Sequence, residues 1–297
     1  MPHWKIILSY DGTPYNGWQI QPALPTVQGT LAAAIAHVTG EQVLPQGSGR
    51  TDTGVHALGQ VASFSLTVPI PAANLHHALN RALPPSIRIL SVTAAPEGFH
   101  ARHNARRKTY EYRIFPESRL HPADSDATLN ARRNTAPAPE SICSPMQAPY
   151  VWACHLPLDQ SLLDQAAQAI LGEHDFTSFA ASDPDLATRE STAATEAETP
   201  PGKSPIRTVL HSSWREQDNL LIYRITGNGF LHHMVRNLVG TFAEIAAHRL
   251  PPDAIPTILA ARSRSAAGPT APARGLFLVN VEYPFPHEQA PTEAGPR

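Results

Sequence analysis

The sequence feature that most limits the possible folds is a repeat: one order of predicted strands and helices occurs twice along the chain. Each time the apolar patterning predicts strand, helix, strand, strand, helix, strand. This order is typical of a ferredoxin-like unit, an antiparallel sheet with helices on one face. The sequence therefore predicts an α+β fold of two ferredoxin-like halves, at residues 1–104 and 105–285. The predicted strands are 4–10, 42–44, 60–68, 87–92, 108–115, 206–214, 220–226 and 276–283, and the predicted helices are 27–39, 71–83, 158–171, 230–250 and 252–262.

Three segments differ in composition from the rest of the chain. Residues 116–148 and 183–205 are rich in Pro, Ala, Ser and Thr, and 286–297 is a similar tail. Because such segments bury too little apolar surface to order themselves, we expect two surface insertions and a disordered tail. The chain has a net charge of −2, which argues against a polyanionic partner. However, residues 116–148, 183–200 and the tail carry the excess acid, and the rest of the chain sums to +4.

The composition also excludes several classes of protein. No run approaches the roughly 18 apolar residues of a membrane helix, and the N-terminus lacks the pattern of a signal peptide. The cysteines, Cys143 and Cys154, provide neither a disulfide framework nor the Cys-x-x-Cys of a zinc site. We therefore expect a cytoplasmic protein without a membrane partner and without a bound metal.

A glycine-rich stretch at 47–57 carries the first candidate site residues, Arg50 and Asp52. An Asp in such a loop often only stabilises a turn through the backbone. It can also act as a single nucleophilic carboxylate. The lack of a second acid nearby in the sequence disfavours a glycosidase, which uses two.

Basic residues precede a predicted strand that carries two tyrosines. Arg102, Arg106, Arg107 and Lys108 could pair with phosphates, and a strand tyrosine such as Tyr110 can stack on an unpaired base. The alternative is a solvated linker that leads into a core strand, in which Tyr110 only packs.

A third stretch, 228–240, contains His232, His233 and Arg236. On the predicted helix 230–250, the adjacent imidazoles point about 100° apart, which disfavours a shared metal. Arg236 is either a solvated charge or the partner of a carboxylate.

Six short motifs in this chain occur in the order and at the approximate spacing found in a known protein family. They are NGWQIQP at 16–22, GRTDTGVHA at 49–57, KTYEY at 108–112, DFTSF at 175–179, FLHHMVRNLVG at 230–240 and GLFLV at 275–279. The chain thereby closely resembles the bacterial tRNA pseudouridine synthase A family, over about 3–115, 150–182 and 205–285. The segment that follows DFTSF is longer than usual in that family.

The resemblance implies an enzyme without a cofactor that acts on tRNA. Its members are isomerases that convert uridine to pseudouridine in the anticodon stem-loop, at tRNA positions 38, 39 and 40. They are implied to be homodimers that clamp tRNA, with an active-site cleft between the two ferredoxin-like halves. The alternatives are a non-catalytic RNA-binding protein on the same fold and, more distantly, a nucleoside or glycoside hydrolase.

The resemblance also implies roles for individual residues. Asp52 matches the catalytic aspartate, and Arg236 matches the arginine paired with it. Tyr110 matches the tyrosine that stacks on the uracil, and its hydroxyl is a weaker candidate for removing the C5 proton. Arg50 would help to displace the target base, and Leu276 would pack near that base. We further expect Arg106, Arg107 and Lys108 to bind the substrate through its phosphates.

Overall fold

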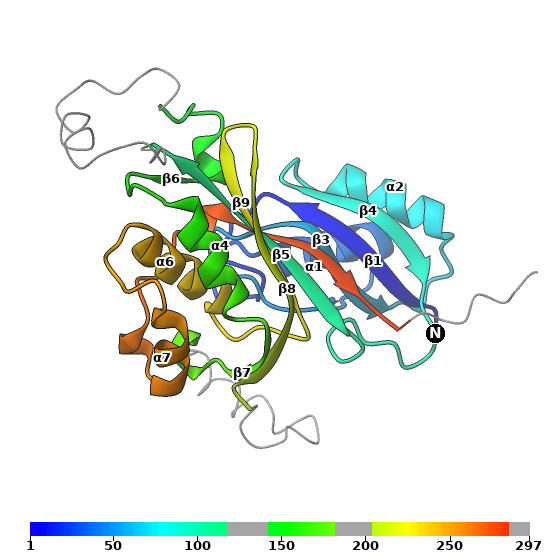
Figure 1. Cartoon of the computed structure of the whole chain (residues 1–297). Coiled ribbons are helices and arrows are strands. Elements are labelled where there is room, and N and C mark those ends of the chain that lie inside the picture. The colour runs from blue at the N-terminus through cyan, green and yellow to red at the C-terminus, as the bar shows by residue number, and fades with distance from the viewer. Residues whose placement is uncertain (118–141, 182–203, 285–297) are drawn as a thin grey trace, which may run out of the picture.

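The computed structural model describes residues 1–117, 142–181 and 204–284. The predicted tail 286–297 and most of the predicted insertions 116–148 and 183–205 lie outside the described residues. The described chain is a mixed α/β fold built on one large, mostly antiparallel sheet (Figure 1).

The elements of the N-terminal part form largely as their local sequence predicts. Strand β1 buries every second residue, among them Trp4 and Ile6. Helix α1 begins after Thr26, whose side chain accepts a hydrogen bond from a backbone amide, and ends at Gly40, which adopts φ +75°. The elements are β1 (His3–Tyr10), α1 (Val27–Thr39), β2 (Gln46–Gly47), β3 (His56–Ser65), α2 (Ala72–Ala82) and β4 (Ile87–Ala94).

Among the described residues, the C-terminal part contains the longest strand and three more α-helices. Strands β6 and β7 lie in segments without a predicted strand, and both are short. The elements are β5 (Arg107–Pro116), β6 (Trp152–Cys154), α4 (Gln160–Gln168), β7 (Gly172–Asp175), β8 (Ile206–Gln217), β9 (Leu220–Gly227), α6 (Met234–Ala246), α7 (Ala254–Ala261) and β10 (Leu276–Glu282).

Two predicted elements are wrong in their position. The predicted strand 42–44 is replaced by Gln46–Gly47, because these two residues pair with β3. The predicted helix 230–250 begins only at Met234. The preceding residue, His233, has φ +59° and ψ +2°, a left-handed conformation that a continuous α-helix cannot contain.

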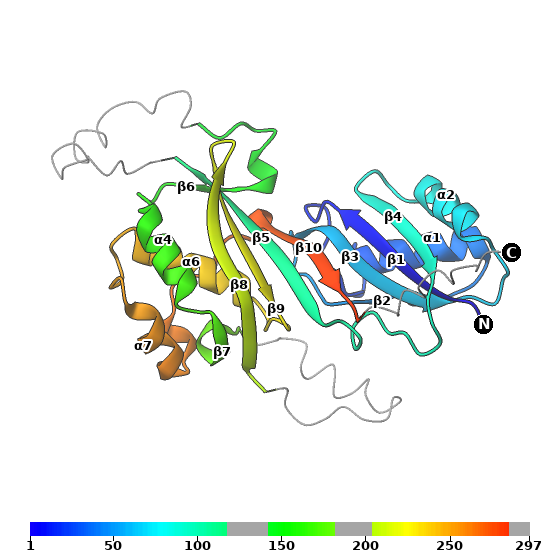
Figure 2. The ribbon, with the colours of Figure 1, turned by 45° about the vertical axis from the view of Figure 1, so that its right-hand side comes forward.

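The strands of both parts join in a single sheet with the order β4-β1-β3-β10-β5-β9-β8-β7. The two parts meet where β10 runs parallel to β3, with Phe277 opposite His56 and Leu278 opposite Ala57. Apart from this pair and the short β5–β6 pair, the described neighbours are antiparallel. Helices α4, α6 and α7 lie at one end of the sheet and α1 and α2 at the other (Figure 2).

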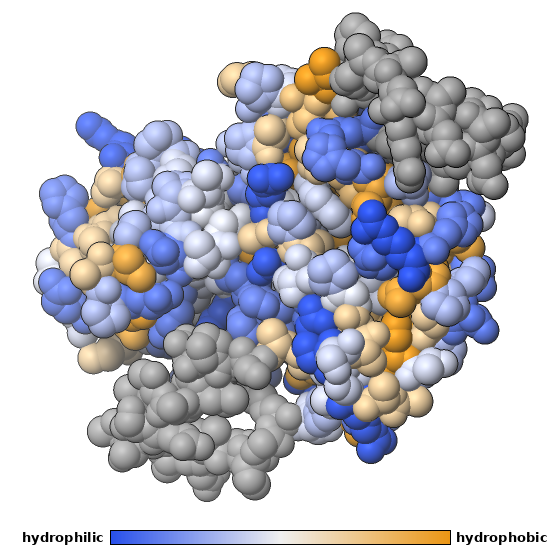
Figure 3. Space-filling view, turned by 90° about the vertical axis from the view of Figure 1, so that its left-hand side faces the viewer, coloured by the Kyte–Doolittle hydropathy of each residue, from blue (hydrophilic) through white to orange (hydrophobic). Residues whose placement is uncertain are grey.

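Most buried side chains of both parts form one continuous core, which Tyr112 and Tyr223 help to fill, and a small second cluster contains Phe115, Val151, Leu220 and Ile222. Tyr223 of β9 packs edge to face on Phe242 of α6, with 5.4 Å between the ring centroids. On the side where α4, α6 and α7 lie, the surface mixes hydrophilic and apolar residues (Figure 3). Among the described residues, no helix is both long and apolar enough to cross a membrane.

Candidate active site

The loop between β2 and β3 carries Asp52 and is fixed from the side of the N-terminal segment. The amide of Trp18 donates to the Thr51 carbonyl at 3.0 Å, and the Thr51 hydroxyl lies 2.8 Å from the hydroxyl of Tyr10. A Cβ on Gly17 would lie 2.6 Å from the Thr51 carbonyl oxygen, so this close approach requires a glycine. The backbone beside Asp52 is thereby held in one position.

Further contacts hold the start of the same loop. The buried side chain of Gln60 accepts a hydrogen bond from the Ser48 hydroxyl at 2.6 Å and donates to the Gly49 carbonyl at 3.0 Å. The ammonium of Lys108, on β5, donates to the Ser48 carbonyl at 2.7 Å. Lys108 therefore ties the loop of the N-terminal part to a strand of the C-terminal part.

The carboxylate of Asp52 contacts three side chains of the C-terminal part. Its Oδ2 accepts a hydrogen bond from Nη1 of Arg236 at 3.0 Å. Nε2 of His233 lies 3.3 Å from the same oxygen, and Nε2 of His232 lies 3.5 Å from Oδ1. Asp52 is 21% exposed, so a substrate can reach it. Asp52 and Arg236, which the sequence predicts to pair, are thus in direct contact in the structure.

Arg236 is fixed by its place in the first turn of α6. Its Nε donates to the Ala271 carbonyl at 2.8 Å, while Nη1 faces Asp52. Only 15% of the side chain is exposed. Because these two hydrogen bonds fix the orientation of the guanidinium, its positive charge lies beside Asp52 and stabilises the ionised carboxylate there.

The two histidines before α6 do not have the geometry that a helix would give them. His232 and His233 stack with 3.9 Å between ring centroids, and both face Asp52. The expected separation of about 100° is wrong, because both residues precede the first helical turn. Asp52, His232 and His233 each offer one ligand atom within 4.8 Å of the others. We assign no metal to them, since the guanidinium of Arg236 on the same carboxylate would repel a second cation.

Tyr110 and Leu276 lie on neighbouring strands beside this cluster. Tyr110 of β5 is buried and packs edge to face on Phe230 at 5.1 Å, and Leu276 begins β10. Burial raises the pKa of the Tyr110 hydroxyl well above its usual value near 10, and the nearby Tyr10 and Asp52 raise it further. Tyr110 is therefore a neutral ring at physiological pH.

One cavity of about 990 Å³ contains these side chains. Asp52, Tyr110, Leu276, His232 and His233 line it, and so do the cations Arg50, Arg102, Lys108 and Arg207. Among the described residues that line the cavity, Asp52 is the only carboxylate. The space and its charge suit an unstacked base with its phosphate, and the single acid suits chemistry that needs one carboxylate.

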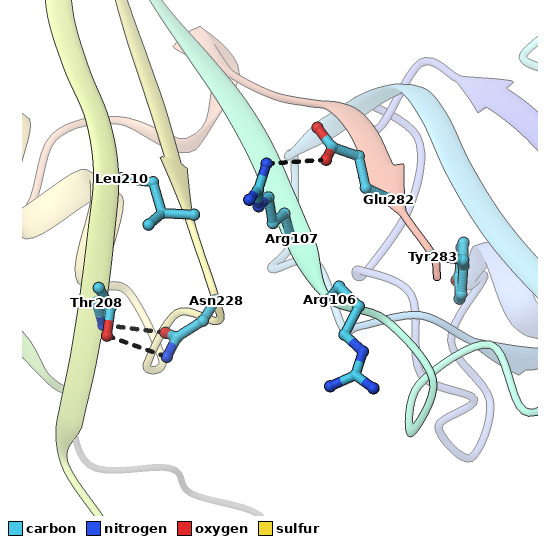
Figure 4. A pocket seen from close by; sticks show the side chains of 7 residues that line it. All are labelled: Arg106, Arg107, Thr208, Leu210, Asn228, Glu282 and Tyr283. Atoms are coloured by element: carbon cyan, nitrogen blue, oxygen red, sulfur yellow. Dashed lines mark hydrogen bonds and ion pairs between the residues drawn. The ribbon is translucent and has the colours of Figure 1, made fainter. Parts of the chain in front are cut away.

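Arg106 and Arg107 lie apart from Asp52. Together with Thr208, Leu210, Asn228, Glu282 and Tyr283 they line a separate depression of about 530 Å³ (Figure 4). Because side chains alternate along β5, Arg107 faces away from Tyr110. Arg107 lies 3.7 Å from Glu282 in an exposed ion pair. The structure therefore does not bring these two predicted residues to the cavity.

Another carboxylate, the buried Glu111, lies next to Tyr110 in sequence but on the opposite face of β5. Glu111 Oε1 lies 2.9 Å from Arg224 and 3.1 Å from Arg215, while Oε2 lies 3.7 Å from Arg113. The guanidinium of Arg113 in turn lies over the ring of Phe277, 3.9 Å from its centroid. Glu111 thus has three arginine neighbours, all on strands of the same sheet.

Sequence reasoning missed three parts of the site. It did not predict the contacts of His232 and His233 with Asp52, or the role of Lys108 in holding the loop. The position of both histidines a few residues before Arg236 was the one available signal, because a group so close to the partner of a carboxylate can also reach it.

Comparisons with a family model and with individual relatives all point to the same family. The family model described as tRNA pseudouridine synthase matches residues 6–104 and 166–284. The tRNA pseudouridine synthase A of Solibacter usitatus is 44% identical over 279 residues, which are 94% of this chain and 98% of that relative. The protein of the same name from Moorella thermoacetica is 42% identical, over 95% of this chain and the whole relative. That of Maridesulfovibrio salexigens is 39% identical, over 94% of this chain and 89% of that relative.

Proposed function

Because this chain belongs to the tRNA pseudouridine synthase family and isomerises uridine to pseudouridine in tRNA, we propose that Asp52 is its catalytic carboxylate. The reaction breaks the N1–C1′ bond, turns the uracil and joins C5 to C1′, without redox change or phosphoryl transfer. The observation that carries the proposal is that Asp52, which lines a cavity together with Tyr110, contacts Arg236 at 3.0 Å. A carboxylate held in this way can act on the ribose or on the base.

The neighbours of Asp52 have supporting roles in this proposal. Arg236 orients the carboxylate and keeps a compensating charge beside it. Tyr110 stacks on the detached uracil, and Leu276 packs against its edge. Arg50, which lines the cavity, fills the gap left when the target nucleotide leaves its stack.

The proposed target uridines lie in the anticodon stem-loop, at tRNA positions 38, 39 and 40. This part of the proposal rests on the motifs shared with the family, and the cations that line the cavity support a substrate that carries phosphates. Lys108 is close enough to the cavity to contact that substrate as well as the loop. Arg106 and Arg107 would contact phosphates farther from the target, because they lie outside the cavity.

The proposal extends to architecture and assembly. Strand orders β4-β1-β3-β2 and β10-β5-β9-β8 support two ferredoxin-like halves, at residues 1–104 and 105–285. The enzyme is proposed to act as a cytoplasmic homodimer that clamps tRNA. Light scattering on the purified protein should give twice the chain mass of 32.1 kDa; the mass of one chain would contradict the dimer.

Release of tritium from tRNA labelled with [5-³H]uridine tests the catalytic assignment. Wild type should release tritium, and Asp52→Ala should lose release while it still binds tRNA. The matched control is Asp218→Ala, because Asp218 lies in the exposed β8–β9 turn and does not line the cavity. Full activity of Asp52→Ala would overturn the assignment. Mapping of pseudouridine in the product tests the positions, and modification only outside the anticodon stem-loop would refute them.

A further inference from the structure

The reaction needs a group that takes a proton, and this group must lie close to Asp52. In the product, C5 of the uracil is bonded to C1′, and the proton that C5 carried has left. If Asp52 acts on the ribose or on the base, as proposed above, then C5 is within a few ångströms of its carboxylate when that proton leaves. A proton acceptor must lie within hydrogen-bond reach of the atom it deprotonates.

The described side chains around Asp52 leave few candidates. Arg236 has no lone pair to accept a proton. Tyr110 keeps its own proton, because burial raises its pKa. Asp52 itself is already assigned to the attack on the ribose or the base, and its Oδ2 accepts a hydrogen bond from Arg236. The remaining groups in contact with Asp52 are the imidazoles of His232 and His233, and both line the cavity.

Of the two histidines, His233 has the more strained backbone conformation. Its backbone has φ +59°, a left-handed conformation that Gly and Asn adopt far more readily than His. Backbone strain of this kind is concentrated at functional sites. The conformation places the ring at the N-terminus of α6, with Nε2 3.3 Å from the oxygen of Asp52 that also binds Arg236.

The contact with Asp52 also determines which nitrogen of His233 can accept a proton. A proton on Nε2 faces the carboxylate and is attracted to it, so the neutral ring has its lone pair on Nδ1. Within the described part of the chain, no side chain or amide donates a hydrogen bond to Nδ1. When the ring takes up a second proton, the negative charge of Asp52 stabilises the imidazolium, as in an aspartate–histidine pair.

We propose that His233 is a catalytic residue that accepts the C5 proton of the turned uracil on Nδ1. The C5–H bond breaks, and its electron pair forms the C5=C6 double bond. The electron pair of the N1=C6 double bond moves to N1, which takes a proton from water. The imidazolium then returns its proton to water, so that the cycle leaves the protein unchanged.

The surroundings of His233 keep it in the state that can accept a proton. Burial lowers the pKa of His233 below its usual value of 6.5; Asp52 raises it, while the neighbouring His232, Arg236 and Arg264 lower it further. The ring is therefore neutral at pH 7. As the pH falls through this lowered pKa, the ring becomes protonated and turnover should fall.

His233→Asn is the variant that tests this proposal, because Asn tolerates the left-handed backbone but cannot act as a base. His248→Asn is the matched control, since His248 also has a left-handed backbone (φ +57°) but lies at the exposed end of α6. Turnover is measured on tRNA that carries uridine or [5-²H]uridine, from pH 5 to pH 8. A His233→Ala variant is measured with and without added imidazole.

We expect His233→Asn to turn over about 100-fold more slowly or worse, with normal tRNA binding. Turnover by this variant should become markedly slower with deuterium at C5 and should lose the acidic limb of its pH profile. Imidazole should partly restore His233→Ala, and His248→Asn should match wild type. Wild-type turnover of His233→Asn would overturn the proposal, and so would slow turnover without an isotope effect or imidazole rescue. Failure of the Asp52 assignment would appear separately, as full activity of Asp52→Ala.

Discussion

Asp52, in the loop between β2 and β3, and Glu111, on strand β5, are two carboxylates with very different surroundings. Glu111 is buried among three arginines on β5, β8 and β9. Asp52 has one arginine and two imidazoles as neighbours, and it opens into a cavity. Guanidinium groups do not titrate, whereas imidazoles exchange protons near neutral pH. The comparison indicates that Glu111 stabilises the sheet, while Asp52 is placed for chemistry.

The two carboxylates also differ in which part of the chain holds them. Glu111 and its arginines all belong to the C-terminal part. Asp52 belongs to the N-terminal part, but the three side chains that contact it come from residues 232–236. The site is therefore complete only when the β3–β10 pair has joined the two parts.

Removal of the arginine beside Asp52 should have the largest effect. Arg236→Ala should lower the single-turnover rate of tritium release by about 100- to 1,000-fold, because the carboxylate loses its fixed positive partner. Arg236→Lys should recover little, since the single nitrogen of a lysine cannot take the places of both Nε, which bonds Ala271, and Nη1, which bonds Asp52. A rate within threefold of wild type for Arg236→Ala would show that the contact is not needed.

The corresponding change at the other carboxylate should affect stability and not turnover. Glu111→Gln should lower the free energy of unfolding by about 2 kcal/mol. This loss is smaller than for a fully buried ion pair, because Arg215 and Arg224 are partly exposed. Urea denaturation measures this loss. The control Glu282→Gln removes an exposed pair and should cost less than about 0.5 kcal/mol. Slow turnover of a folded Glu111→Gln enzyme would contradict the distinction between the two carboxylates.

The sequence allowed some of these features to be predicted but not others. Helix α1 was predictable, because Thr26 and Gly40 are local signals for its two ends. The start of α6 was not, since nothing local marks a histidine with a left-handed backbone. The join of β3 to β10 also depends on residues more than 200 positions apart, which no local pattern reveals. The family was predictable from six short motifs in order, because such matches can be read without knowledge of the fold, and the family model confirms it.

The ring beside Asp52 should matter more than its hydroxyl. Tyr110→Ala should weaken productive binding by about 10- to 100-fold, which corresponds to a lost stacking energy of about 1–3 kcal/mol. Tyr110→Phe should stay close to wild type, because the raised pKa keeps the hydroxyl protonated. Tritium release over a range of tRNA concentrations measures both. If Tyr110→Phe lost as much activity as Tyr110→Ala, the hydroxyl of Tyr110 would have to take part in proton transfer.

The smallest of these effects should follow from loosening the loop of Asp52. Lys108→Ala should slow tritium release by about tenfold, because the charged hydrogen bond to Ser48 is lost. The salt dependence of tRNA binding should also become slightly shallower, because Lys108 is proposed to contact the substrate as well as the loop. The control Arg107→Ala should have normal turnover and a shallower salt dependence. A normal rate with a shallower salt dependence for Lys108→Ala would show that Lys108 contacts phosphate but is not needed to hold the loop.

A comparison of Asp52→Asn, Arg236→Ala and the double variant tests most directly whether the two residues act as one unit across the two parts of the chain. The measurement is the single-turnover rate of tritium release from saturating [5-³H]uridine-labelled tRNA. If Asp52 and Arg236 act as one unit, the double variant should be no slower than the slower single variant. Losses that multiply in the double variant would contradict this account, because they would show that the two residues contribute independently.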